Sequence, residues 1–217
     1  MRRYAQVLRG VEINSSFYRN HARTTYARWA SQTPRAFRFS VKLPRQITHA
    51  QRLRAARRPL QEFLDGVTGL GRRLGPLVVQ LPPSLAFEPR IARTFFALLR
   101  QLHAGPVACE PRHPSWFDAR ADALLRRYKI ARIAADPVVV PAAALPGGWH
   151  GLVYYRLHGS PRKYWSTYER KRLAQWAREL KALPRGTTAW CVFDNTASSG
   201  ATGNALQMLE SGTGIGQ

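Results

Sequence analysis

Residues 152–158 read Leu-Val-Tyr-Tyr-Arg-Leu-His, a run of strand length in which apolar and polar side chains alternate. Successive side chains on a β-strand point to opposite faces, so Val153 and Leu157 share one face of this predicted strand. Arg156 and His158 lie on the other face. One face is therefore suited to packing under a helix, whereas the other presents charged groups toward the end of the strand.

Six other stretches resemble this one, and segments with helical spacing separate them. The seven predicted strands are residues 10–14, 37–43, 77–81, 107–110, 132–136, 152–158 and 189–194. Between the strands, apolar residues recur at intervals of three, four or seven, as at Ile91, Phe95 and Leu98. Strands that alternate with helices predict an α/β fold with a parallel sheet.

Two architectures fit this order of elements: an open doubly wound sheet, or a (β/α)8 barrel that lacks one strand. No Gly-x-Gly-x-x-Gly turn follows the first strand, which disfavours a dinucleotide-binding fold. A sheet covered on both faces needs apolar residues on both, but here the even-numbered face is largely polar. Its polar positions are Glu12, Asn14, Arg38, Ser40, Lys42, Gln80, Glu110, Arg132, Asp136, Tyr154, Arg156, His158 and Asp194. We therefore expect a TIM-type barrel in a single domain over residues 1–217, with residues 211–217 as a mobile tail.

Composition limits the function. The chain has 217 residues, with 34 Lys or Arg against 12 Asp or Glu, and a formal net charge of +22. Such a charge attracts nucleic acid without a specific site, although the arginines are scattered rather than grouped in a basic arm. No apolar run approaches the ~20 residues that span a bilayer, and the N-terminus lacks the apolar stretch of a signal peptide. These features favour a soluble, cytoplasmic protein.

Charged residues gather at the predicted carboxyl ends of the strands, where the active sites of barrel enzymes lie. The candidate catalytic residues are Glu12, Lys42, Glu110, Asp136, His158 and Asp194. Glu12 and Glu110 are candidates for general acid and base, and Lys42 for an electrostatic clamp or acid. A Schiff base at Lys42 is an alternative that requires a desolvated neutral amine. A divalent cation is an open alternative but is not favoured, because neither its candidate ligands nor the two cysteines have a regular metal spacing. The candidate ligands are Glu12, Glu110, His113, Asp136, His158 and Asp194.

A small phosphorylated or carboxylated ligand is the expected partner. The loop over residues 194–200 leads into a helix whose first amides could hold an anion, and arginines could add bidentate contacts. The candidate substrate-binding residues are Asn14, Tyr18, Arg19, Gln80, Arg112, His113, Trp116, Arg156, Trp165, Asn195 and Ser199.

Seven blocks of the chain resemble those of the DUF72 (YecE-like) family. They are VEINSSFYR (11–19), FSVKLP (39–44), QLPPS (80–84), EPRHPSW (110–116), AD (135–136), YRLHGS (155–160) and FDNT (193–196). The resemblance implies a TIM-type barrel but no established activity. Family members usually begin with a strand that ends in a Gly-Thr-Ser-Gly-Trp-like turn, which this chain lacks. Without it, the strands that carry Glu12 and Asp194 would each have an unpaired edge, unless upstream sequence, residues 1–10 or a partner chain fills the gap.

Three functional interpretations remain open. The first is an enzyme, such as a hydrolase, lyase or isomerase, that applies acid–base chemistry to a small anionic substrate. The second is a protein that binds or processes nucleic acid through its arginine-rich surface. The third is a truncated, non-catalytic barrel.

Overall fold

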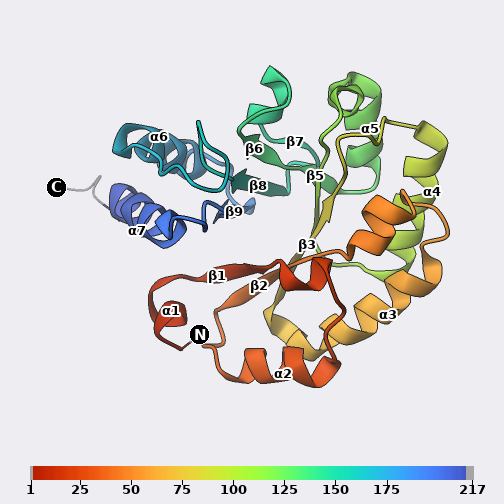
Figure 1. Cartoon of the computed structure of the whole chain (residues 1–217), viewed down its shortest axis with the longest axis horizontal. Coiled ribbons are helices and arrows are strands. Elements are labelled where there is room, and N and C mark those ends of the chain that lie inside the picture. Colours follow the sequence, from red (N-terminus) through yellow and green to blue (C-terminus); the bar gives the residue numbers. More distant parts are fainter. Residues whose placement is uncertain (1, 214–217) are drawn as a thin grey trace.

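A computed structural model describes residues 2–213, which fold into parallel sheets covered by helices (Figure 1). The first sheet contains, in spatial order, β1 (Gly10–Ile13), β2 (Arg38–Lys42), β3 (Leu74–Gln80), β4 (Val107–Glu110), β5 (Ile130–Arg132) and β7 (Gly147–Gly148). The second contains β6 (Ala134–Asp136), β8 (Leu152–Leu157) and β9 (Thr188–Phe193). Every pair is parallel except β5 with β7. The predicted parallel α/β architecture is confirmed.

The two sheets are joined through β5 and β6, which are separated by Ile133 alone. The amide of Ile133 donates to the carbonyl of Cys109 in β4 at 2.8 Å, so the chain passes from one sheet into the other without a loop. At the far ends, β1 pairs only with β2 and β9 only with β8 among the described residues. No closed barrel is therefore formed in this part of the chain, and each end strand has an open edge.

The helices alternate with the strands along the chain. They are α1 (Arg2–Val7), α2 (Arg23–Ser31), α3 (Arg57–Val67), α4 (Pro89–Leu102), α5 (Ala119–Arg127), α6 (Arg170–Lys181) and α7 (Gly200–Thr213). Short helical turns are η1 (Ser15–Phe17), η2 (Gln46–Ala50), η3 (Thr68–Arg73), η4 (Pro114–Phe117) and η5 (Pro141–Ala144). Helices α2 to α5 cover the outer side of the first sheet, and α6 and α7 lie beside the second (Figure 1).

Local sequence accounts for the helix positions. Leu60, Phe63 and Val67 lie on one side of α3 and are buried against the sheet, as helical periodicity requires. The Asp118 carboxylate accepts the Ala121 amide at 2.7 Å and caps the start of α5. Helix α1 was not predicted. Residues 211–213 form the end of α7 instead of a separate tail, and residues 214–217 of that predicted tail lie outside the described residues.

The core has an outer and an inner layer. Odd-numbered residues of the first sheet, such as Phe39 and Val79, pack under the helices. The inner layer contains even-numbered residues of β3, β4 and β8, namely Val78, Ala108 and Tyr154. It also contains odd-numbered residues of the segment that forms β5 and β6, namely Ala131 and Ile133. The predicted face was therefore wrong for β5 and β6.

The register explains that error. Ala108 of β4 pairs with Ala131 of β5, so odd-numbered residues of this strand share the inner face with even-numbered residues of β4. Arg132 is directed to the helical side, where its Nε donates to Asp122 Oδ1 at 3.1 Å. Asp136 lies on the same outer face of its strand.

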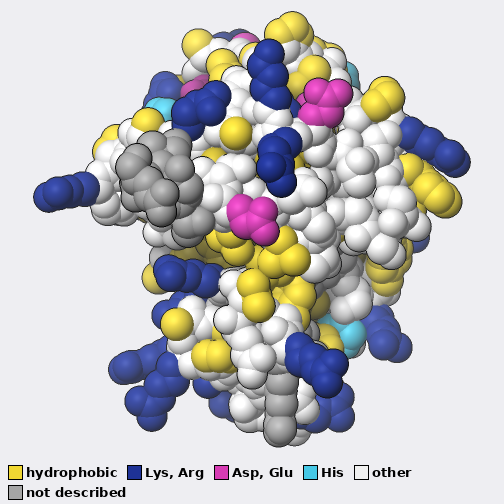
Figure 2. Space-filling view, turned by 90° about the vertical axis from the view of Figure 1, so that its left-hand side faces the viewer, with side chains coloured by type: hydrophobic (Ala, Val, Ile, Leu, Met, Phe, Trp, Pro, Cys, Tyr) yellow, Lys and Arg dark blue, Asp and Glu magenta, His cyan; other side chains and the backbone are white. Residues whose placement is uncertain are grey.

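None of the helices within residues 2–213 is both long and apolar enough to cross a bilayer. On the face shown in Figure 2, Lys and Arg side chains lie at many separate places, with few acidic side chains between them. Apolar side chains gather across the middle of the same face. Among the described residues on this side, the basic charge is therefore dispersed and does not line one groove.

Candidate functional site

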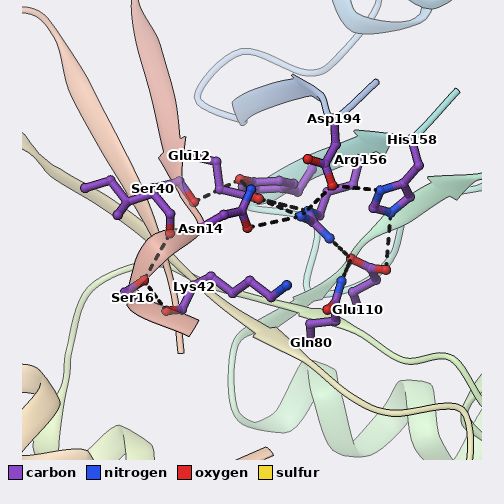
Figure 3. A network of polar contacts seen from close by, with 12 residues as sticks. Glu12, Asn14, Ser16, Ser40, Lys42, Gln80, Glu110, Arg156, His158 and Asp194 are labelled. Carbon is purple, nitrogen blue, oxygen red and sulfur yellow. Dashed lines mark hydrogen bonds and ion pairs between the residues drawn. The ribbon is translucent and has the colours of Figure 1, made fainter. Parts of the chain in front are cut away.

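Arg156 of β8 is the centre of a buried charged cluster (Figure 3). Arg156 is 0% exposed, and its guanidinium contacts three carboxylates from distant parts of the chain. Nη2 lies 2.6 Å from Glu12 Oε1 and 3.3 Å from Asp194 Oδ2, and Nη1 donates to Glu110 Oε2. Glu12 belongs to β1, Glu110 ends β4 and Asp194 follows β9, so one side chain joins the ends of four strands.

Glu110 is the most heavily bonded carboxylate of the cluster. Besides Arg156, it accepts from Gln80 Nε2 at 3.0 Å and from Arg112 Nε at 2.8 Å. His158 Nε2 lies 3.4 Å from Glu110 Oε1, which is within ion-pair distance. Register brings these groups together, because Gln80 pairs directly with Glu110 across β3 and β4.

Glu12 has a second partner on the inner face, the hydroxyl of Tyr154. This hydroxyl lies 2.8 Å from Glu12 Oε2 and 2.8 Å from Ser40 Oγ. A phenol has one proton, so Tyr154 donates to the carboxylate and accepts from the Ser40 hydroxyl. Tyr154 and Ser40 were not among the predicted site residues, although the alternation of side chains had assigned both to the inner face.

The ion pairs fix the charge state of the cluster. Burial alone would raise the pKa of Glu110, but Arg156, His158 and Arg112 outweigh it and hold that pKa well below its usual range. Burial would also raise the pKa of Asp194, but the hydrogen bond with His158 and the charge of Arg156 outweigh it and lower that pKa. Burial would lower the pKa of Arg156, yet its carboxylate neighbours raise it well above normal. Glu110 is therefore an ionised, bonded group and is unsuited to donate a proton.

Lys42, at the end of β2, differs from the arginines around it. It is 8% exposed, and no hydrogen bond or ion pair of its Nζ is found among residues 2–213. Nζ instead lies 3.9 Å from the centroid of the Phe17 ring. Burial and the charge of Arg156 lower the pKa of Lys42 to about 8, against the opposing effect of Glu110 and Glu12.

A cavity of about 120 Å³ lies beside the charged cluster. Its polar lining is Glu110, Arg112, His158 and Lys163, and its apolar lining includes Ile133. Arg112 Nη2 and His158 Nε2 are buried and make no hydrogen bond within residues 2–213, although His158 Nε2 keeps its ion-pair contact with Glu110. On the other side of the imidazole, Nδ1 lies 3.0 Å from Asp194 Oδ2. Among the described residues, Arg112 therefore lines the cavity with one buried N–H group that has no acceptor.

The structure brings together a little over half of the predicted site residues. The residues found in the cluster are Glu12, Asn14, Lys42, Gln80, Glu110, Arg112, Arg156, His158 and Asp194. Asp136 lies outside it, because its carboxylate accepts the hydroxyl of Tyr168 at 3.0 Å on the outer face of the strand. Lys163 lines the cavity but was not among the residues predicted to bind substrate.

The remaining predicted binding residues have other surroundings. Tyr18 is 75% exposed, Arg19 is exposed, and Trp165 is 47% exposed beneath Arg162. Trp116 is buried in the core with its indole N–H donating to the Leu85 carbonyl. His113 caps η4, and Asn195 donates to the carbonyl of Ser166. Ser199 is exposed just before α7. Among the described residues, none of these seven side chains forms a hydrogen bond or ion pair with the charged cluster.

The carboxylates and histidines of the cluster are not arranged as metal ligands. Within residues 2–213, no group of three or more His, Cys, Asp or Glu side chains is arranged to hold a metal ion. The carboxylates of the cluster are instead directed at the Arg156 guanidinium.

Fold and cluster together define a mixed α/β protein whose parallel strands end in a buried polar centre. The chain belongs to the DUF72 family, since it matches the family described as "Protein of unknown function DUF72" over residues 1–213. The resemblance found in the sequence blocks is confirmed.

Named relatives support this assignment. The chain is 33% identical over 115 residues to the UPF0759 protein YecE of Escherichia coli K12, a match that covers 52% of this chain but only 42% of YecE. It is 22% identical to the UPF0759 protein YunF of Bacillus subtilis 168, with 92% of this chain and 82% of YunF covered.

Crystal structures of two DUF72 family proteins have the same fold. The protein from Enterococcus faecalis V583 superposes with a TM-score of 0.82 at 18% identity, over 96% of this chain and 86% of the other. The protein from Thermotoga maritima MSB8 gives a TM-score of 0.81 at 23% identity, over 95% of this chain and 86% of the other.

Proposed function

We propose that this protein binds a small phosphorylated or carboxylated molecule in the cavity beside Arg112 and His158 and applies acid–base chemistry to it. The observation that carries the proposal is Arg112 Nη2, a buried donor that makes no hydrogen bond with the described residues and belongs to a side chain lining the cavity. A buried donor without an acceptor costs about 1–3 kcal/mol, which an anion in the cavity would recover. Lys163 adds a second cationic side chain to the lining.

The size of the cavity limits the ligand. Its volume of about 120 Å³ is roughly four times the ~30 Å³ share of one water in the liquid. This space suits a phosphate or carboxylate group with a short carbon chain. Arg112 is held by Glu110 through Nε, which leaves Nη2 for the ligand.

His158 is the group suited to exchange protons with the ligand. Its Nδ1 faces Asp194, and this contact fixes the orientation of the ring. Nε2 is then the atom that gives or takes a proton at the cavity. Glu12 and Glu110 act in this proposal as anchors for Arg156 and Arg112 rather than as general acid and base.

The proposal includes the finer architecture, a single domain in which the two sheets form one interrupted TIM-type barrel. Contacts across the open side support it. Arg156 of β8 binds Glu12 of β1, and the ring of Trp190 in β9 lies against the backbone of Gly10 and Gly75. A Cβ added at Gly75 would lie 2.8 Å from that ring, so the close approach requires glycine.

Titration calorimetry with inorganic phosphate and with succinate, at constant ionic strength, tests the binding step. We expect saturable binding that weakens at least about tenfold in Arg112→Gln and in Lys163→Gln, because each loses one charged contact. Arg120→Gln, an exposed arginine on α5, is the matched control and should bind like the parent protein. If all three variants bind equally, the cavity is not the site and the affinity comes from net charge alone.

A further inference from the structure

The amine of Lys42 is chemically distinct from every other cation of the cluster. Arg156 and Arg112 each have a carboxylate partner, whereas within the described part of the chain the one contact found for Lys42 Nζ is the Phe17 ring. We propose that Lys42 is a nucleophile whose amine condenses with the carbonyl carbon of an anionic substrate to form an imine. This inference rests on the proposed anion site, and it narrows the substrate class to anionic aldehydes and ketones, such as 2-oxo acids and phosphorylated sugars.

The backbone holds Lys42 firmly in place. It ends β2, which lies between β1 and β3, and Lys42 pairs with Val78 in the register of these strands. Ser16 Oγ lies 2.7 Å from the Lys42 carbonyl, so η1 is fixed against the end of β2 and brings Phe17 over the amine. Figure 3 shows the side chain extended toward the group that Gln80, Glu110 and Arg156 form. The amine is therefore directed at the same centre as Glu110, which lines the cavity.

The surroundings favour the neutral, nucleophilic form of the amine. A phenyl ring and a nearby guanidinium provide neither an acceptor nor a negative charge at bonding distance from Nζ. Because burial and Arg156 lower the pKa of Lys42 to about 8, a large share of the amine is neutral at mildly alkaline pH. A lysine beside another cation in a desolvated pocket is a recognised way to obtain a nucleophilic amine.

The proposed step balances without any further reactant. The lone pair of Nζ attacks the carbonyl carbon, the C=O π pair moves to oxygen, and that oxygen takes a proton to give a carbinolamine. The nitrogen then loses a proton, the C–O bond breaks, and the protonated oxygen leaves as water while a C=N bond forms. The protons that oxygen gains are supplied by the nitrogen and by a general acid, for which His158 is the suited group. The sum is one amine, one carbonyl and one proton from the general acid giving one protonated imine and one water; return of that proton to the acid leaves the neutral imine.

An imine has a clear use in such a site. Its protonated form withdraws electrons from the neighbouring carbon, which eases removal of a proton there or cleavage of the adjacent C–C bond. A carboxylate or phosphate bound at Arg112 would hold the substrate while the bond to Lys42 forms. The chemistry that follows is that of a lyase or an isomerase.

Reductive trapping on the full chain tests the inference. The protein is incubated at pH 8 with pyruvate or with dihydroxyacetone phosphate, the imine is reduced with sodium cyanoborohydride, and the product is analysed by intact mass and peptide mapping. We expect one adduct, on Lys42, formed at least about tenfold faster than on the exposed Lys171 and Lys181, which serve as internal controls. The Lys42→Arg variant keeps the charge and should lose the adduct.

The outcomes separate the two proposals. Absence of an adduct with both probes, or adducts on Lys163 or on exposed lysines instead of Lys42, overturns the role of Lys42 even if phosphate binding is intact. If Lys42 is trapped by neutral propanal as fast as by pyruvate, and phosphate does not compete, the nucleophile is supported and the anion site is wrong. Competition by phosphate against trapping at Lys42 supports both. Labelling is done on the parent protein, so the result does not depend on whether a variant folds.

Discussion

The two sheets of this protein are packed very differently. The inner strands of the first sheet are buried on both faces, and α2 to α5 cover its outer side with one continuous apolar cluster. In the second sheet β8 is buried along its whole length, but β9 begins with the exposed Thr188 and Ala189, and the remaining residues of β9 are only half-buried. Arg156 of the second sheet is bonded to carboxylates of the first. The comparison teaches that the polar centre, besides serving a site, links a well-packed sheet to a less protected one.

Removing Arg156, which links the two sheets, should have the largest effect on the free energy of unfolding. Arg156→Met leaves Glu12, Glu110 and Asp194 buried together without their common cation, so we expect the free energy of unfolding to fall by about 3–5 kcal/mol. Urea denaturation measures it. Arg58→Gln, which removes an exposed pair with Glu62, is the control and should change it by about 0.5 kcal/mol or less. An equally small loss in Arg156→Met would mean that the sheets are held together by their apolar contacts.

Matched truncations in the two apolar clusters test the difference in packing directly. Phe95 of α4 is 1% exposed in the first cluster, whereas Phe193 of β9 is only partly buried in the second. We expect Phe95→Ala to lower the free energy of unfolding by about 3–5 kcal/mol and Phe193→Ala by about 1–2 kcal/mol. Equal losses in thermal or urea unfolding would contradict the comparison.

The first sheet carries a destabilising group of its own in Lys42. Because the pKa of Lys42 is lowered from 10.5 to about 8 in the folded state, the folded protein binds fewer protons than the unfolded chain between these values. The free energy of unfolding should therefore rise as pH increases from 8 to 10.5, and this rise should be absent in Lys42→Met. Below pH 8 the variant should be more stable than the parent by on the order of 2 kcal/mol. A less stable Lys42→Met at pH 7 would show that the lysine contributes to stability.

Tyr154 and Tyr155 are neighbours in β8 whose hydroxyls lie on its inner and outer faces, so their variants compare the hydrogen bonds of the two faces. The Tyr154 hydroxyl bonds to buried Glu12 and Ser40, whereas the Tyr155 hydroxyl donates to Glu179 near the surface. We expect Tyr154→Phe to cost about 1–2 kcal/mol, because buried partners lose a hydrogen bond, and Tyr155→Phe about 0.5 kcal/mol. Differential scanning calorimetry of the two variants gives the difference, and a reversed order would place the more important contact on the outer face.

The sequence predicted most of the sheet because strand alternation is a local property. All seven predicted strands exist, with ends shifted by a few residues and with residues 132–136 extended to β5 and β6. The two-residue β7 was missed because Gly147 and Gly148 have no pattern to detect. Register was not predictable in the same way. The loop before β5 decides which of its faces points inward, and therefore Arg132 and Asp136 were assigned to the wrong side.

The candidate site was predicted where it depends on strand ends and missed where it depends on loops. Glu12, Glu110 and Arg156 followed from alternation together with the convergence of parallel strands. Trp165 and Ser199 were selected because their loops follow the last two predicted strands, and neither that position nor side-chain chemistry fixes where a loop lies. Whether carboxylates act as acids or as anchors also depends on distances to Arg156, which no spacing along the chain encodes.

The charged centre joins residues that are very far apart along the chain. Arg156 is 144 residues from Glu12, 46 from Glu110 and 38 from Asp194. Contacts between distant residues are slow to form, because the chain loses the entropy of closing a long loop before the contact stabilises it. If these contacts are absent from the transition state for folding, weakening them leaves the folding rate unchanged and speeds unfolding. The buried arginine would then govern the lifetime of the native protein rather than the speed at which it is made.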